Sequence, residues 1–141
     1  MTTLFSTRAI AHSTPVVRRG RAGVIALWIT QIVVAAMFLL VGGLKLTGAP
    51  ALVALFDAIG AGQWLRYVTG SIEVVSGLAL LVPSLAAFGA LLLVPTMVGA
   101  IATQLFIVGG SPVPATVLLI GSVAIAWARR DQLAAAWSRL G

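Results

Sequence analysis

The segment Tyr67–Val82, YVTGSIEVVSGLALLV, decides how this chain is interpreted. It is apolar enough to lie in a bilayer, yet Glu73 stands near its middle. A charged residue at the centre of a membrane helix costs roughly 2.5–3.5 kcal/mol on insertion scales, so a chain keeps one when another group neutralises it. Ionisable residues inside a membrane are by default candidates for functional sites. The sequence therefore poses one main question, namely which side chains face Glu73.

The composition is typical of a membrane protein. Of 141 residues, 60% are hydrophobic and 9% are charged, and the mean hydropathy is +1.12. Soluble domains average about 25% charged residues. Cysteine is absent, which excludes disulfides, thiol redox chemistry and thiolate metal sites, and the one histidine, His12, stands in a polar N-terminal stretch. We therefore expect a single membrane domain with no metal site, no catalytic residue and no independent catalytic activity.

The basic residues flank the apolar runs instead of forming one patch. The formal net charge is +6, and most of it lies before the first run or after the last one, on Arg8, Arg18, Arg19, Arg21, Arg129, Arg130 and Arg139. Basic residues beside membrane spans mark the cytoplasmic side. The distribution predicts cytoplasmic termini and an even number of spans, and it argues against nucleic acid as a partner. We expect the protein in the plasma (inner) membrane.

The apolar runs predict an all-α fold, a bundle of four antiparallel transmembrane helices. The expected spans cover about residues 22–45, 65–82, 85–108 and 112–128, so the membrane domain is 22–128. The first run is longer than the apolar region of a signal peptide, which has ~7–15 residues. Residues 1–21 are expected to be a disordered cytoplasmic tail, and 129–141 an amphipathic cytoplasmic tail. A short helix is expected after Pro50, in the outer loop between the first two spans.

Glycines recur along the expected spans. Gly42 lies in the first span, Gly70 and Gly77 lie in the second, and Gly99 lies in the third. Small residues allow the backbones of neighbouring membrane helices to approach closely. We therefore expect these four positions to lie at contacts between helices.

Lys45 is the first candidate to neutralise Glu73. In the expected orientation Lys45 lies near the outer end of the first span, and Glu73 lies roughly 12 Å below the outer end of the second. Side chains lean toward the N-terminus of their helix, so these two incline toward each other, and a lysine stem can snorkel in that direction. Arg66 lies two turns above Glu73 on the same stripe and is the second candidate.

Gln104 and Thr103 fall at a similar depth in the third span. With Lys45, Arg66 and Glu73 they form an expected polar cluster, a candidate ligand site in the outer half of the bundle. The inner half is expected to be drier, with Gln31 and Ser76 as its polar groups. A plainer explanation stays open for each member: interface charges for Lys45 and Arg66, an interhelical hydrogen bond for Gln104, and a purely structural Glu73–Lys45 pair.

Three motifs, in order, resemble the DoxX-like family of small four-helix membrane proteins. They are FLLVGGLKL (Phe38–Leu46), YVTGSIEVVSGLALLVP (Tyr67–Pro83) and MVGAIATQL (Met97–Leu105). The resemblance covers about residues 24–130 and puts the family's lysine on Lys45 and its second-helix glutamate on Glu73. Many members have a histidine where this chain has Gln104, and this departure weakens a proton-relay or metal role at that position.

The resemblance implies a membrane subunit or partner of a redox system, either quinone-linked or related to oxidative stress. A quinone is then the candidate ligand, no cofactor is intrinsic, and a membrane-associated oxidoreductase is the candidate partner besides the lipid bilayer. Two other functions stay open. One is a small-solute or proton transporter, for which a homo-oligomer would complete the pathway. The other is a structural or assembly subunit in which Glu73–Lys45 fixes helix pairing.

Overall fold

The computed structural model describes residues 20–139, which form helices and turns with no strand among them. In chain order the elements are α1 (Arg21–Thr47), α2 (Pro50–Ile59), α3 (Gln63–Leu81), α4 (Ala86–Thr103), the π-helix η1 (Gln104–Val108), α5 (Val113–Ala128) and α6 (Arg130–Trp137). The all-α prediction is confirmed. The tail expected at residues 1–21, with His12, lies outside the described residues except for its last two positions, and Arg21 begins α1.

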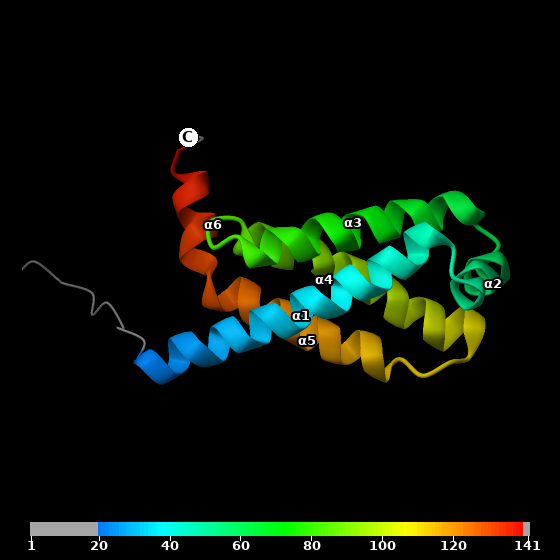
Figure 1. Cartoon of the computed structure of the whole chain (residues 1–141), viewed down its shortest axis with the longest axis horizontal. Coiled ribbons are helices and arrows are strands. Elements are labelled where there is room, and N and C mark those ends of the chain that lie inside the picture. Colours follow the sequence, from blue (N-terminus) through cyan, green and yellow to red (C-terminus); the bar gives the residue numbers. More distant parts are fainter. Residues whose placement is uncertain (1–19, 140–141) are drawn as a thin grey trace, which may run out of the picture.

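The helices α1, α3, α4 and α5 lie side by side along the long axis of the molecule (Figure 1). α1 packs against α3 and α5, and α4 packs against the same two helices. The short α2 contacts α1, α3 and η1 at one end, which we call the outer end. At the other, inner end, α6 bends away from α5 by 56° and contacts α4.

Length and composition identify two helices that could cross a membrane. They are α1, and α4 continued by η1 as Ala86–Val108. A third candidate results when the bent pair of α5 and α6 is counted as one broken span. α3 is not among them; it carries Arg66 and Glu73, which lower its hydropathy, and α5 alone has 16 residues, about 24 Å of helix. The described residues thus contain two or three candidate spans, and the four-span arrangement stays a prediction.

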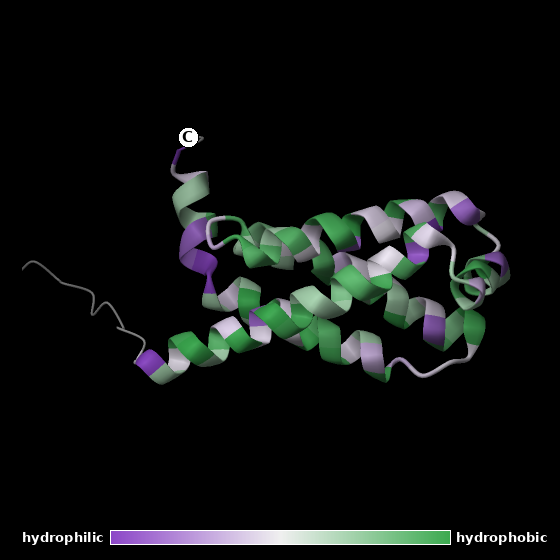
Figure 2. Cartoon of the chain, viewed as in Figure 1, coloured by the Kyte–Doolittle hydropathy of each residue, from purple (hydrophilic) through white to green (hydrophobic). Residues whose placement is uncertain are grey.

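The long helices are apolar on both their inner and their outer faces. Phe38, Leu80, Leu93 and Ile125, one from each of the four helices, are fully buried in the core. Many large apolar side chains also point outward from the same helices, and hydrophobic colour covers most of their ribbons in Figure 2. Helices that are hydrophobic all round belong in an apolar environment. The fold therefore has the surface of a membrane protein.

Glycines bring α1 and α3 into close contact. A Cβ atom at Gly42 would lie 2.9 Å from the carbonyl oxygen of Gly70, and one at Gly70 would lie 2.9 Å from Cβ of Lys45. Gly77 packs in the same way against Leu39, with 3.1 Å from the position of its Cβ to Cγ of Leu39. The structure therefore has three of the four expected glycines at a helix contact.

The expectation for Gly99 is wrong. Apart from its chain neighbours and the backbone of its own helix, no atom lies within 4 Å of the position that its Cβ would take, and the residue is exposed. The close approach of α3 and α4 occurs instead at Gly89, nearer the inner end, where a Cβ would lie 2.8 Å from the carbonyl oxygen of Ser76. The two helices diverge from Gly89 toward Gly99, and this opening leaves room for a cavity.

Candidate functional site

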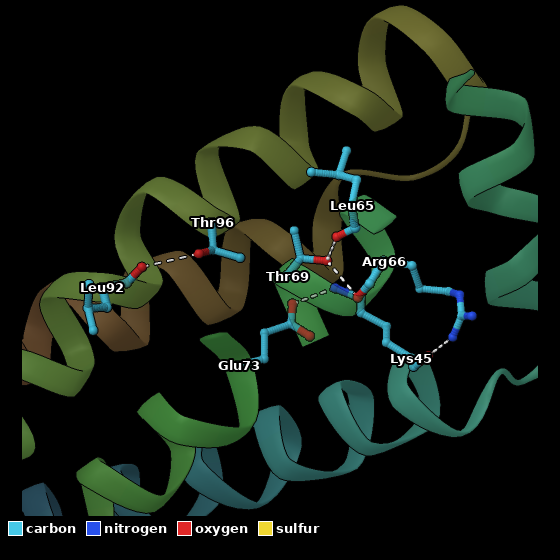
Figure 3. Close-up of polar contacts among 7 residues, drawn as sticks. All are labelled: Lys45, Leu65, Arg66, Thr69, Glu73, Leu92 and Thr96. Atoms are coloured by element: carbon cyan, nitrogen blue, oxygen red, sulfur yellow. Dashed lines mark hydrogen bonds and ion pairs between the residues drawn. The ribbon is translucent and has the colours of Figure 1, made fainter. Parts of the chain in front are cut away.

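Lys45 and Glu73 form a buried ion pair between α1 and α3 (Figure 3). Nζ of Lys45 lies 2.6 Å from Oε1 of Glu73, and the two residues are 8% and 1% exposed. The contact is short because the glycine pair Gly42 and Gly70 holds the two backbones together within one turn of it. Phe56 of α2 covers the pair from the outer end, with its ring centroid 5.8 Å from Nζ of Lys45.

The second carboxylate oxygen of Glu73 is buried and has no hydrogen-bond partner in the described part of the chain. An ionised carboxylate offers about four acceptor positions, and leaving a buried acceptor without a donor costs about 1–3 kcal/mol. Native proteins leave few such groups, and each calls for an explanation. At Glu73 the surroundings supply one, because the residue lies in the wall of a cavity.

We call this cavity, which Glu73 lines, the inner cavity, although it lies toward the outer end of the bundle. It has a volume of about 190 Å³. Its wall contains two charged side chains, Glu73 and Lys45, and the amide of Gln104. The rest of the wall comes from α1, α2, α4, α5 and the turn before α5 and is mostly apolar: Phe38, Val41, Leu52, Leu55, Met97, Ala100, Ser111, Pro114, Ala115 and Leu118. Sites for small organic ligands have this character, an apolar slot with a few polar groups that fix orientation.

A second, outer cavity of about 250 Å³ adjoins the first. The two share Lys45, Leu55, Ala100 and Gln104 as wall residues. The outer cavity continues between α3 and α4, where Thr69 and Thr96 line it (Figure 3). Its wall also includes Pro95 and Gly99, which are exposed, so this cavity reaches the surface of the molecule.

Arg66 does not pair with Glu73, so its expected role as a second partner is wrong. Its Nη1 donates to the backbone carbonyl of Lys45, and its Nε donates to Oε1 of Gln63 at 2.6 Å. Gln63 in turn donates from Nε2 to Oδ1 of Asp57 in α2 at 2.7 Å. The last carbonyls of a helix lack partners within it and favour a cation. Arg66 therefore caps the end of α1 and joins α1, α2 and α3 around Lys45.

Gln104 and Thr103 line the cavities without touching the ion pair. Gln104 borders both cavities, Thr103 borders the outer one, and no hydrogen bond in residues 20–139 links either side chain to Lys45 or Glu73. Gln104 is the first residue of η1, and its side chain lies against Gly110. π-Helical turns inside α-helices are frequent at functional sites. Of the expected cluster, the structure thus brings Lys45 and Glu73 into contact and leaves Gln104 and Thr103 as wall residues.

A second polar contact, which the sequence analysis did not predict, lies at the inner end. Gln31, fully buried in α1, donates to the carbonyl of Leu80 and accepts a hydrogen bond from Nε of Arg129 at 2.9 Å. The guanidinium of Arg129 also lies over the ring of Trp28, 5.5 Å from its centroid. The inner half of the bundle is therefore more polar than expected, and Arg129 contacts α1 there in addition to following α5. The signal was available in Gln31, a polar residue inside an apolar run.

No group of three or more His, Cys, Asp or Glu side chains that could hold a metal ion occurs within residues 20–139. The donors and acceptors around the two cavities suit an organic head group, with an ammonium, a carboxylate and an amide.

Comparison with known proteins gives one match. The model of a family described as the DoxX-like family matches residues 29–129, a range that contains all three motifs quoted above. No curated protein and no solved structure matches the chain.

Proposed function

The chain belongs to the DoxX-like family, and from this premise we propose that it is a membrane subunit of a redox system that binds a quinone-type lipid beside Lys45 and Glu73. Family membership and the apolar helices indicate a membrane protein. One observation carries the proposal for the ligand. Oε2 of Glu73 is buried and lacks a donor within the described residues, and the Glu73 residue lines a cavity together with Lys45.

The proposed topology has four antiparallel spans with both termini on the cytoplasmic side of the plasma membrane. The charges that lower the hydropathy of α3 have internal partners, since Glu73 pairs with Lys45 and Arg66 caps α1. Paired charges are far less costly in a membrane than isolated ones. Arginines at both ends of the chain support the orientation, and the outer cavity then lies in the half of the membrane away from the cytoplasm.

The wall residues fit the head group of a quinone. Such a head group is a substituted ring with polar oxygens, which needs an apolar slot and donors at its edge. Lys45 has three N–H donors, of which one is used toward Glu73, and Gln104 adds an amide at the point where the two cavities meet. A bound quinone would supply the electron-transfer chemistry. This chain's own residues would hold the ring, exclude water, and accept a proton at Oε2 of Glu73.

A separate oxidoreductase is part of the proposal. The chain contains no cysteine for thiol redox chemistry, so in this proposal a partner protein exchanges electrons with the bound lipid. The protein would then hold the lipid in the membrane for such a partner and would have no independent turnover.

A structural or assembly role is the second candidate function. The observation that favours it is the position of the Lys45–Glu73 pair beside the Gly42–Gly70 contact, where α1 and α3 are closest. Buried ion pairs of this kind can fix which helices pair and in which register.

Affinity purification from native membranes in mild detergent separates these functions. We expect the wild-type protein to retain a quinone-type lipid, counted as quinone plus quinol, and an oxidoreductase. We expect Glu73→Gln to lower the amount of this lipid per folded protein about tenfold, because a hydrogen bond from a ligand hydroxyl to a charged group contributes about 1.5–3 kcal/mol. Asp57→Asn, which changes an exposed acid outside both cavities, is the matched control and should retain the lipid.

Two outcomes would contradict the proposal. If the wild-type protein carries neither a quinone nor an oxidoreductase, the redox function is wrong. If Glu73→Gln keeps its quinone and its partner but yields less folded protein, the structural role replaces it.

A further inference from the structure

We propose that the ligand binds in its reduced form, as a hydroxyl-bearing quinol with a long apolar tail, and that it enters sideways from the bilayer between α3 and α4. This inference rests on the proposed function and specifies the chemistry and the route of its ligand. It follows from the hydrogen-bonding state of Glu73 and from the shape of the two cavities.

The hydrogen bonds around Glu73 select a ligand that donates. Oε1 already accepts from Lys45 at 2.6 Å, whereas Oε2 is buried and accepts from no described residue. The carbonyl oxygens of an oxidised quinone can only accept, so such a ligand would leave Oε2 without a donor. A quinol hydroxyl can donate to Oε2 and also accept from Lys45. The site is therefore complementary to the reduced form on both counts.

The volumes of the two cavities indicate where the head group and the tail of the ligand would lie. A cavity of about 150 Å³ holds a benzene molecule. The inner cavity of about 190 Å³ therefore has room for one substituted ring. The outer cavity adjoins it and has a mostly apolar wall, including Leu55, Phe56, Ile59 and Leu65. A head group beside Glu73 would thus place its tail in the outer cavity.

The outer cavity opens toward the side of the bundle. Its wall reaches the exposed residues Pro95 and Gly99 on α4, and the neighbouring surface of α4 carries the exposed apolar side chains of Leu92 and Val98. Gly99 has open space where a side chain would stand. The opening therefore faces a lipid environment in the proposed topology, and Gly99 lies at its rim.

The test measures equilibrium binding of three ligands to the full-length protein in lipid nanodiscs. They are decylubiquinol, decylubiquinone and the tailless hydroquinone head group. We expect wild-type protein to bind decylubiquinol at least about tenfold more tightly than decylubiquinone, which corresponds to one unsatisfied buried acceptor. We expect Glu73→Gln to reduce this preference to within about threefold.

Gly99→Trp tests the route. The indole would fill the opening, so we expect the affinity for decylubiquinol to fall at least about tenfold while that for the tailless head group changes less than about threefold. Retained binding of the head group shows that the variant is folded. Gly43→Trp is the matched control, because Gly43 also has open space at its Cβ position but lies on α1 outside both cavities. It should leave all three affinities unchanged.

The outcomes distinguish this inference from the function on which it rests. If wild-type protein binds neither redox form, the proposed quinone-binding function is wrong. If it binds both forms equally, or the oxidised form more tightly, the function stands and the preference for a donor is wrong. If Gly99→Trp lowers tailed and tailless binding equally, or neither, the lateral route is wrong.

Discussion

Replacing Lys45 by methionine is expected to lower the free energy of unfolding by about 3–5 kcal/mol, because it leaves the Glu73 carboxylate buried without a counter-charge. Methionine keeps most of the length and volume of the lysine stem, so the loss reports the charge rather than a cavity. Both carboxylate oxygens would then lack a donor within the described residues, since Oε2 already lacks one. The measurement is reversible unfolding of the purified protein in mixed detergent micelles.

The double variant Lys45→Met with Glu73→Leu is the control for this result. Removing both charges from an apolar site is often nearly neutral, so the double variant should recover at least half of the loss. A single Lys45→Met variant with wild-type stability would mean that the pair contributes nothing to the bundle. Additive losses in the double variant would mean that the two side chains do not interact.

Replacing Gly42 by alanine is expected to cost about 1–3 kcal/mol, because one methyl group must enter a contact that has no room for it. The added Cβ would lie 2.9 Å from the carbonyl oxygen of Gly70, 2.9 Å from Cγ2 of Val74 and 3.0 Å from Cβ of Glu73. The backbone of α3 would have to move away from α1, and the movement would also lengthen the contact between Lys45 and Glu73. Gly42→Leu should prevent the bundle from forming.

Gly43→Ala is the matched control in the same helix. Apart from its chain neighbours and the backbone of its own helix, no atom lies within 4 Å of its Cβ position. Alanine favours a helix over glycine by roughly 0.5–1 kcal/mol, so this variant should be as stable as the wild type or slightly more stable. Unfolding in the same micelles compares the two. Equal effects at positions 42 and 43 would contradict the close contact of α1 with α3.

The contact between Lys45 and Glu73 could be predicted from the sequence for a simple reason. An apolar run with one acid needs a base, antiparallel neighbours bring the two depths together, and the lean of helical side chains gives the direction. The helix after Pro50 and the short helix after Arg129 were likewise visible in local spacing. These features depend on one helix or on one pair of neighbouring helices.

The rest depended on contacts that spacing alone does not show. Arg66 carries the same charge as Lys45, but the backbone carbonyl of Lys45 at the end of α1 binds it, and backbone groups leave no pattern in a sequence. Gly99 has the same spacing as a packing glycine, although α3 and α4 have already diverged there. The Gln31–Arg129 contact joins α1 to the residue that follows α5, so it needs the whole bundle in place.

Glu73 connects these observations, because its two oxygens have different surroundings. One oxygen holds α1 to α3 through Lys45, and the other is buried without a donor in the described chain, on a residue that lines a cavity. The structural and the ligand-binding roles of the pair are therefore compatible. A single substitution at Glu73 affects both, which is why the experiments above combine stability with binding.

Infrared difference spectroscopy of the carboxylate of Glu73 tests the central claim most directly. Adding decylubiquinol to the protein in nanodiscs should shift a carboxylate stretching band in the wild type, because a hydroxyl donor then reaches Oε2. The same band should be missing from the difference spectrum of Glu73→Gln and present in that of Asp57→Asn. A wild-type spectrum without this band, or one identical to that of Glu73→Gln, would contradict the assignment of Glu73 as the ligand's acceptor.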